Sequence, residues 1–399
     1  MTREQIYNIC LDKLQYSHNL LLELPTGFGK SKLAIDIINH LINEAKWPKD
    51  KTPTILLLVA KRVHKQTWNE EFQKWGGIHA QVIAECYESL HKHAKESFDF
   101  ILLDEVHHVG SEARMRHLNM VNTSYMIGLS ATIPRPVKQY FKFRYHTQIV
   151  SCNLTEAIQS DILPEPQVLL FPLLLDNRQP TETWEYHTDA KGPVIHAEYK
   201  DIRKYKFNKN VHSIVSMTQK QKLMEFDNLI DFFKNRAMAG NVAAKRSWLF
   251  QAGKRLEFLA DIKMPIIKDI LHHLKNHRTI TFCKTIDQTE KAGRNCIHSK
   301  NSFGPKLYEM FNKKEINHIT AVNILNENAN LVDCKYAIFC NLSSSEVMVP
   351  QRIGRSLRHR SPVIIIPYYQ NTREEELVAK MVEGFNKDCI KTIHSIQEI

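Results

Sequence analysis

The sequence predicts an α/β protein in which two parallel-sheet domains follow one another and a basic, mainly helical insertion interrupts the second. Three observations predict this fold. Strand-length apolar runs alternate with amphipathic segments in the first 150 residues, the same alternation returns from residue 279, and the stretch between is rich in lysine and arginine. Such alternation is typical of parallel sheets that helices cover on both faces.

The first domain is expected over residues 1–150. Its strands are predicted at four apolar runs, residues 20–24, 55–59, 100–103 and 125–129. The segment after the second run has apolar residues at the spacing of one helical face, namely Val63, Trp68, Phe72 and Trp75. Polar or glycine-rich sequence follows each strand, and open parallel sheets bind their ligands at that edge.

A linker is expected at residues 151–166, which contain Pro164 and Pro166. The second domain is expected over residues 167–399. It has a strand-like run directly after the linker and four more at residues 280–283, 319–322, 337–340 and 363–366. We expect the insertion at about residues 176–264 and predict helices from about Asn210, because few turn residues occur before Pro265.

The charge of the chain is concentrated in this insertion. The net charge is +11, and 15 lysines and arginines against 7 aspartates and glutamates between Lys191 and Lys263 account for +8 of it. This favours a polyanionic partner, but charge alone leaves an anionic membrane surface open. With no signal-peptide pattern and only strand-length apolar runs, we expect a cytoplasmic protein without membrane segments. The eight cysteines form no CxxC pair, which favours reduced thiols over disulfides or a zinc site.

A candidate phosphate-binding loop (P-loop) connects the first strand to a helix-like stretch. Glycines let backbone N–H groups surround phosphate oxygens, Lys30 can reach the terminal phosphates, and the Ser31 hydroxyl can bind Mg²⁺. Leu24 replaces the first glycine of the general pattern GxxxxGK[ST], so the strand–loop–helix context carries the assignment. A glycine turn with a solvated lysine is the alternative. The predicted ATP-binding residues are Thr26, Gly27, Phe28, Gly29, Lys30 and Ser31.

Two adjacent carboxylates, Asp104 and Glu105, follow the third apolar run. Asp104 is suited to hold Mg²⁺ through water, and Glu105 can orient or deprotonate the water that attacks the terminal phosphate. Acidic pairs at strand ends are often only solvated or capping groups. Beside a phosphate-binding lysine, the catalytic interpretation is favoured.

With these two elements, the sequence resembles the DExH helicases of superfamily 2 over most of its length. Residues 25–31 resemble motif I, residues 104–107 motif II and residues 130–132 motif III. The resemblance implies two RecA-like domains that hydrolyse ATP between them with Mg²⁺. It also implies that His107, Ser130 and Thr132 couple the nucleotide state to domain movement. Gln5 is similar to the glutamine with which relatives recognise adenine, although a solvated helix residue is an equal alternative.

The second half carries further resemblances. Residues 279–284 resemble motif IV, and residues 325–330 resemble motif V with Asn328 in place of the usual glycine. Residues 351–358 resemble motif VI, and on a helix Gln351, Arg355 and Arg358 share one face. The resemblance implies that Arg355 and Arg358 act on the γ-phosphate as arginine fingers. A basic helix that faces solvent or nucleic acid is the alternative.

Candidate nucleic-acid contacts come from two regions. Residues 59–62, with the following Gln66 and Trp68, resemble motif Ia, which touches the nucleic-acid backbone in relatives, and they supply Lys61 and Arg62. The insertion supplies Arg203, Lys204, Lys245 and Arg246, the last two beside Trp248 and Phe250. These aromatic rings could stack on bases or form the buried face of a helix. Residues 153–163 and 255–263 resemble segments of restriction-subunit-like and phage branch-remodelling DNA helicases, which favours DNA over RNA.

The sequence therefore predicts an ATP-dependent helicase or translocase, acting on branched or partly single-stranded DNA, for which a monomer is plausible. One alternative is the motor subunit of a restriction or defence complex that translocates without unwinding. Another is a nucleic-acid-binding scaffold with residual ATPase activity. The joint presence of five residues with roles in hydrolysis argues against the scaffold: Lys30, Asp104, Glu105, Arg355 and Arg358.

Overall fold

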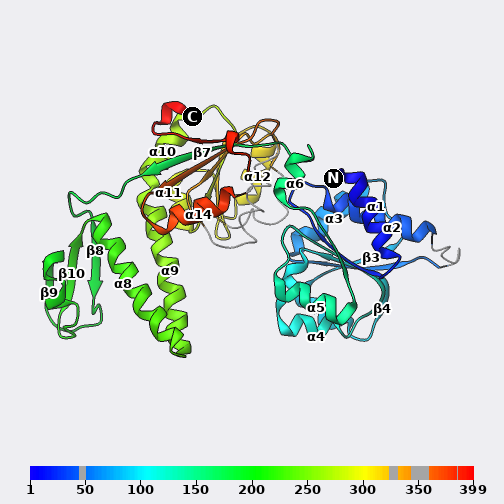
Figure 1. The fold of residues 1–399 in the computed structure, drawn as a ribbon, viewed down its shortest axis with the longest axis horizontal. Coiled ribbons are helices and arrows are strands. Elements are labelled where there is room, and N and C mark those ends of the chain that lie inside the picture. The colour runs from blue at the N-terminus through cyan, green and yellow to red at the C-terminus, as the bar shows by residue number, and fades with distance from the viewer. Residues whose placement is uncertain (45–50, 323–330, 343–358, 384) are drawn as a thin grey trace.

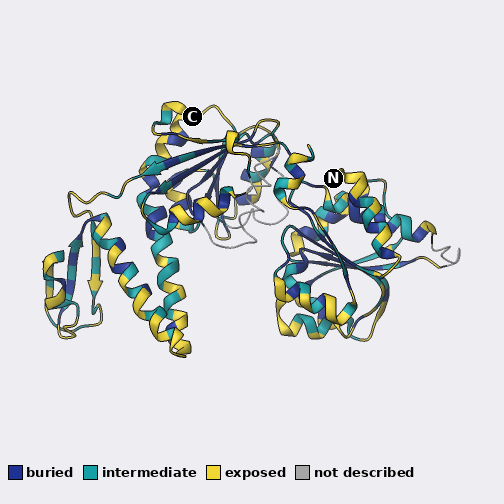
Figure 2. Cartoon of the chain, in the orientation of Figure 1, coloured by how far each residue is buried: buried dark blue, intermediate teal, exposed yellow. Residues whose placement is uncertain are grey.

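The computed structural model describes residues 1–44, 51–322, 331–342, 359–383 and 385–399. Two parallel sheets, each covered by helices, confirm the predicted α/β fold class (Figure 1). A small third sheet and two long helices extend from the second α/β unit. Buried residues follow the strands of both large sheets, which places the main cores between sheet and helices (Figure 2).

The first sheet has six parallel strands in the order β3-β2-β4-β5-β1-β6. They are β1 (Asn19–Glu23), β2 (Thr54–Val59), β3 (Gln81–Cys86), β4 (Ser97–Asp104), β5 (Asn122–Ser130) and β6 (Gln148–Ser151). Helices α1 (Arg3–Leu14), α2 (Lys30–Glu44) and α3 (Arg62–Lys74) cover one face. The other face is covered by η1 (Tyr87–His93), η2 (Val106–Gly110), α4 (Glu112–Leu118) and α5 (Arg135–Tyr145).

The buried face of α3 differs from the predicted one at its first residue. His64, Trp68 and Phe72 are buried, whereas the side chain of Val63 is 63% exposed. The buried residues recur every fourth position and therefore form one stripe along the helix. Val63 lies off this stripe, so the prediction that it shares one helical face with Trp68 and Phe72 was wrong.

The second sheet has seven parallel strands in the order β12-β13-β11-β14-β15-β7-β16. They are β7 (Gln167–Leu173), β11 (Thr279–Cys283), β12 (Cys296–Ile297), β13 (His318–Val322), β14 (Tyr336–Phe339), β15 (Val363–Tyr369) and β16 (Ile390–Thr392). Its described helical segments are α10 (Met264–His273), α11 (Ile286–Ala292), α12 (Gly304–Asn312), α14 (Arg373–Val382), η5 (Lys387–Cys389) and η6 (Ile396–Glu398). Helix α6 (Leu154–Gln159) precedes β7, which pairs with β15, so the chain enters this sheet before the insertion begins.

The insertion contains a small sheet in the order β8-β10-β9, which the sequence did not predict. Its strands are β8 (Glu182–Tyr186), β9 (Val194–Glu198) and β10 (His212–Met217), with η3 (Tyr199–Asp201) and α7 (Ile202–Tyr205) between the last two. Helices α8 (Gln219–Met238) and α9 (Val242–Ile262) then form an antiparallel hairpin (Figure 1). The prediction of helix from Asn210 was therefore too early, because β10 takes residues 212–217.

Two further features concern the described helices and the cysteines. In the described ranges, no helix is both long and apolar enough to cross a lipid bilayer. All eight cysteines are free thiols, and seven of them are buried. Burial raises the pKa of the Cys10 thiol to about 12, as expected for a packed, unreactive side chain.

A buried ion pair joins the end of the insertion to the second sheet. Lys263, between α9 and α10, is 0% exposed, and its Nζ lies 2.5 Å from Glu374 Oε1 and 3.2 Å from the Pro367 carbonyl oxygen. Glu374 Oε2 also accepts the backbone N–H of Tyr369 at 3.0 Å. The pair thus connects the base of the hairpin to β15 and α14.

We expect Lys263→Met to lower the free energy of unfolding by about 3–5 kcal/mol, because Glu374 would keep a buried charge without its cation. Urea denaturation followed by circular dichroism measures the change. Lys254→Met is the matched control on α9, since the Lys254–Glu257 pair is largely exposed and should contribute at most about 1 kcal/mol. Equal effects of the two substitutions would contradict this assignment.

Candidate nucleotide-binding site

The loop between β1 and α2 has the backbone of an anion-binding turn. Gly27 and Gly29 have φ angles of 95° and 99°, which glycine adopts without the strain that a side chain would cause. Helix α2 begins directly afterwards at Lys30, so the unpaired N–H groups of its first turn face the loop. Phe28 is buried beneath the loop, and its carbonyl oxygen accepts Arg3 Nε of α1 at 2.9 Å.

The Lys30 side chain lies back over this loop. Its Nζ donates to the carbonyl oxygen of Leu24 at 3.0 Å and lies 3.5 Å from that of Pro25. The carbonyl oxygens are neutral acceptors, whereas a phosphate group is a charged one. A hydrogen bond from the lysine ammonium group to phosphate is therefore stronger than one to a carbonyl oxygen. The lysine is therefore placed to exchange loop carbonyls for phosphate oxygens.

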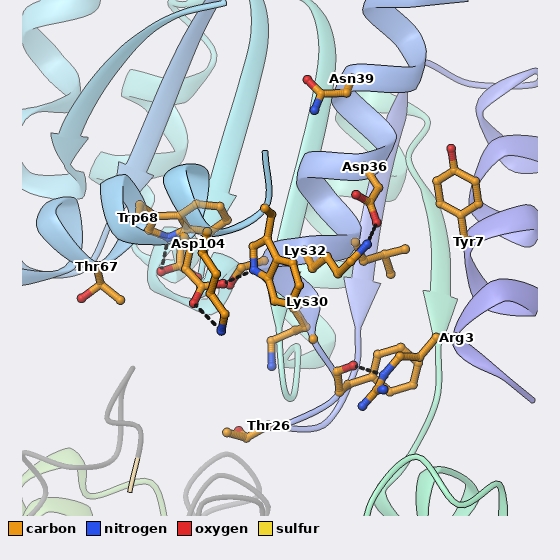
Figure 3. Close-up of a pocket in the computed structure, with 18 of the residues that line it drawn as sticks. Arg3, Tyr7, Thr26, Lys30, Lys32, Asp36, Asn39, Thr67, Trp68 and Asp104 are labelled. Carbon is orange, nitrogen blue, oxygen red and sulfur yellow. Dashed lines mark hydrogen bonds and ion pairs between the residues drawn. The ribbon is translucent and has the colours of Figure 1, made fainter. Parts of the chain in front are cut away.

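An open cavity of about 1030 Å³ lies above the loop (Figure 3). Helices α1, α2 and α3 contribute to its wall. The structure brings the predicted phosphate-binding and acidic residues together here, because the cavity is lined by Thr26, Gly27, Phe28, Gly29, Lys30, Ser31, Asp104 and Glu105.

The acidic pair reaches this cavity through a backbone reversal at the end of β4. Successive side chains of a strand point to opposite faces. Glu105 has φ 51° and ψ 59°, a left-handed conformation that is uncommon for residues other than glycine, and it ends the strand after Asp104. Both carboxylates consequently line the same cavity, and both residues are buried.

Two neutral donors hold Asp104. Trp68 Nε1 donates to Asp104 Oδ2 at 3.0 Å, and the Tyr87 hydroxyl donates to the Asp104 carbonyl oxygen at 2.9 Å. Burial, and then the negative charges of Asp104 and Glu105, raise the pKa of Tyr87 well above its usual value. The tyrosine therefore stays protonated and keeps its donor.

A hydrogen-bonded network joins Glu105 to the end of β5. The Ser130 hydroxyl lies 3.1 Å from Glu105 Oε2 and 2.9 Å from the Thr132 carbonyl oxygen, and it can donate to one of them at a time. His107 Nδ1 lies 2.9 Å from the same hydroxyl and 3.4 Å from Glu105 Oε2. Ser130 thus contacts both of the other predicted coupling residues, His107 and Thr132, and Ser130 and His107 contact Glu105.

The network is also tied to the loop. The backbone N–H of Leu24 donates to the Ser130 carbonyl oxygen at 3.0 Å. Glu23, at the end of β1, accepts the backbone N–H of Ile133 at 2.8 Å and Lys138 Nζ at 2.6 Å. A change at the loop can therefore reach the end of β5 through direct contacts.

The geometry does not support the predicted adenine contact of Gln5. The Gln5 side chain is exposed and accepts the backbone N–H of Thr2 at 2.7 Å, while Thr2 Oγ1 accepts the backbone N–H of Gln5. This capping box begins α1 and turns the glutamine toward the N-terminus of its own helix. Arg3 and Tyr7 of the same helix line the cavity instead.

The predicted contacts of motifs V and VI lie outside the described residues. This applies to residues 325–330 and to Gln351, Arg355 and Arg358.

The candidate nucleic-acid contacts are all exposed but far apart in the chain. Lys61 and Arg62 form the start of α3, Arg203 and Lys204 lie on α7, and Lys245 and Arg246 lie on α9. Beside the last pair, Trp248 is half-buried, whereas Phe250 is 61% exposed and Leu249 59%. Phe250 is thus not part of a buried helix face.

Sequence reasoning missed the donors that hold the acidic residues. The sequence places Trp68 on an apolar helix face and in the resemblance to motif Ia, and it does not single out Tyr87. Only their indole N–H and phenol O–H groups could have signalled a role, since buried donors of this kind usually find a polar partner.

Two family models match the chain. Residues 2–135 match that of the type III restriction enzyme res subunit, and residues 262–360 match the helicase conserved C-terminal domain. A curated relative, the DNA 3'-5' translocase XPB2 of Sulfurisphaera tokodaii, is 20% identical over 382 residues, which cover 85% of this chain and 75% of that protein.

Two solved structures are similar in fold. The ATP-dependent type ISP restriction-modification enzyme LlaBIII bound to DNA gives a TM-score of 0.56 at 13% identity over 99% of this chain. The match covers 31% of LlaBIII, so this chain spans about a third of that enzyme's length. Dbp5 of S. cerevisiae, bound to RNA and ADP BeF3, gives 0.52 at 12% identity over 94% of this chain and 85% of Dbp5. At such identities these structures support the RecA-like fold alone.

Proposed function

We propose that the chain is a superfamily 2 helicase, a nucleic-acid-dependent ATPase that moves along DNA that is branched or partly single-stranded. The observation that carries the proposal is the single cavity lined by a glycine loop, a lysine, a hydroxyl and two carboxylates. These are the groups that phosphoryl transfer from ATP to water needs, since its catalysis is mostly positioning and charge stabilisation.

In this proposal, the loop and the first turn of α2 hold the phosphates of ATP. The N–H groups from Thr26 to Ser31 surround the phosphate oxygens, and Lys30 exchanges its loop carbonyls for the terminal phosphates. Arg355 and Arg358, together with Gln351, would complete the site from the second domain, the two arginines as arginine fingers, as the resemblance to motif VI implies. This last assignment rests on the sequence alone.

The residues present fit Mg²⁺ bound together with ATP. Mg²⁺ takes oxygen ligands, keeps several waters and is usually held by one or two carboxylates plus phosphates. The Ser31 hydroxyl and the Asp104 carboxylate line the same cavity, and the described ranges contain no cluster of three or more His, Cys, Asp or Glu suited to a metal. Bound there, the ion would neutralise charge on the phosphates.

Glu105 would orient and deprotonate the attacking water. The hydrogen bonds that join Glu105 to Ser130 and His107 would then transmit the change of charge at Glu105. Because the Ser130 hydroxyl can donate to Glu105 or to the Thr132 carbonyl oxygen, a change of charge at Glu105 alters which bond it makes. The end of β5 would then respond to the nucleotide state. This is the physical basis that we propose for the coupling role of His107, Ser130 and Thr132.

DNA is favoured over RNA by the name of the curated relative, since XPB2 is a DNA 3'-5' translocase. The match of residues 2–135 to a restriction-enzyme subunit supports a second candidate function, a restriction or defence motor that translocates without unwinding.

The proposed function is tested by ATPase rates measured in parallel with single-stranded DNA, duplex DNA, forked DNA and single-stranded RNA. We expect the forked or single-stranded DNA to stimulate hydrolysis most. If duplex DNA stimulates hydrolysis as strongly as forked and single-stranded DNA do, the restriction-type motor is favoured. If RNA stimulates hydrolysis most, the preference for DNA is overturned.

A further prediction concerns the hairpin of α8 and α9 as a nucleic-acid contact. The double substitution Lys245→Gln and Arg246→Gln should weaken DNA binding for every sequence and lower the log–log salt slope by roughly one unit per lost phosphate contact. Fluorescence anisotropy at several salt concentrations measures both quantities. Lys220→Gln, at the other end of α8 and remote in the chain from the hairpin tip, serves as the control. An unchanged slope would place the DNA elsewhere.

A further inference from the structure

A buried hydrogen bond connects α3 to the acidic pair. Trp68 Nε1 donates to Asp104 Oδ2 at 3.0 Å, and both residues line the cavity (Figure 3). Trp68 is 2% exposed and Asp104 6%. This bond lies at the carboxyl end of β4, where the proposed function places Asp104 as a Mg²⁺ ligand.

Packing alone does not require this bond. Trp68 packs on Phe72 with ring centroids 5.5 Å apart, and a phenylalanine ring could fill much of the same space. Helix α3 also shows a simpler solution for an indole, because Trp75 Nε1 donates to Glu71 Oε2, one turn back on the same helix, at 2.8 Å. Trp68 instead donates across elements to a carboxylate of the cavity.

The bond helps to fix the orientation of the Asp104 carboxylate. The main chain of Asp104 is held by the β4 pairing and by the Tyr87 hydroxyl, which donates to its carbonyl oxygen. A donor on Oδ2 restricts rotation of the carboxylate plane about the Cβ–Cγ bond. Groups that orient a metal ligand in this way typically change metal affinity or activity by about 10–100-fold when removed.

We propose that Trp68 is a positioning residue, whose indole N–H orients the Asp104 carboxylate for Mg²⁺ bound with the nucleotide. This inference rests on the proposed function of the cavity and adds α3 to the elements that shape its metal site. In this role Trp68 would act through Asp104 and would not itself take part in phosphoryl transfer.

The test is Mn²⁺ binding in the presence of ADP, followed by electron paramagnetic resonance of free Mn²⁺. Trp68→Phe keeps an aromatic ring and removes the donor, so we expect about 10–100-fold weaker Mn²⁺ binding than in the wild type. Trp75→Phe removes a donor of the same kind from the same helix, and it should leave the affinity for Mn²⁺ unchanged. Wild-type affinity in Trp68→Phe would overturn the role of Trp68.

A second comparison separates positioning from a general structural effect. In a protein that already carries Asp104→Ala, Trp68→Phe should cause no further loss of Mn²⁺ affinity, because the two residues act in one interaction. An additional loss of the same size would show that Trp68 acts elsewhere. If Trp68→Phe does not fold, benzothienylalanine at position 68 keeps the ring shape and removes only the N–H.

The same titration distinguishes the two levels of the proposal. If the wild type binds no Mn²⁺ with ADP, the proposed function of the cavity fails and the role of Trp68 fails with it. If the wild type binds Mn²⁺ and both tryptophan variants match it, only the role of Trp68 fails.

Discussion

Lys30→Ala is expected to reduce ATP hydrolysis in the presence of saturating single-stranded DNA to the background rate. The loop would lose the cation that lies over it, since Lys30 Nζ contacts the carbonyl oxygens of Leu24 and Pro25. The negative charge that develops on the terminal phosphate during hydrolysis would then no longer be stabilised by a lysine. A coupled-enzyme ATPase assay measures the effect.

The matched control is Lys32→Ala, two residues further along α2. Lys32 forms an ion pair with Asp36 on its own helix and is about half exposed, so its loss removes a nearby charge without changing the loop (Figure 3). We expect near-native turnover for this variant. Near-native turnover of Lys30→Ala as well would remove the loop from the mechanism.

Glu105→Gln is expected to bind ATP but to hydrolyse it about 10²–10⁴-fold more slowly, the range in which a general base contributes. Glutamine keeps the shape of the side chain, and its amide oxygen can still accept the Ser130 hydroxyl that lies 3.1 Å from Glu105 Oε2. It cannot take a proton from water. Single-turnover hydrolysis and the binding of a fluorescent ATP analogue separate the chemical step from binding.

The outcome that would contradict this role is loss of nucleotide binding with a normal rate for the bound fraction. Such a result would make Glu105 a structural residue of the cavity. Because Glu105 has an uncommon left-handed backbone, the variant should also be shown to melt at the wild-type temperature.

The sequence predicted the fully buried strands but not the partly exposed ones. β2 and β4 are apolar on both faces and therefore form continuous runs that are visible without a structure. β3 is partly exposed along most of its length, and β10 alternates buried and half-buried positions, so neither has such a run. The pairing of β10 with β8 and β9 depends on contacts between distant segments, which local patterns do not reveal.

The candidate site divides in a similar way. The loop and the acidic pair could be predicted because their chemistry needs certain residues at fixed spacing along the chain. The Trp68–Asp104 bond joins positions 36 residues apart and has no such spacing. Gln5 shows the opposite case, since its residue type suited adenine but the capping box at the start of α1 uses its side chain.

The central claim is that ATP hydrolysis in this cavity drives movement along DNA. Displacement of streptavidin from a biotinylated single strand tests it most directly, with the forked substrate as a second measurement. We predict displacement that requires hydrolysable ATP, proceeds from one end of the strand only and disappears in Lys30→Ala. ATP hydrolysis that DNA stimulates without displacement of streptavidin from either end would contradict the claim and leave a nucleic-acid-binding ATPase that does not move.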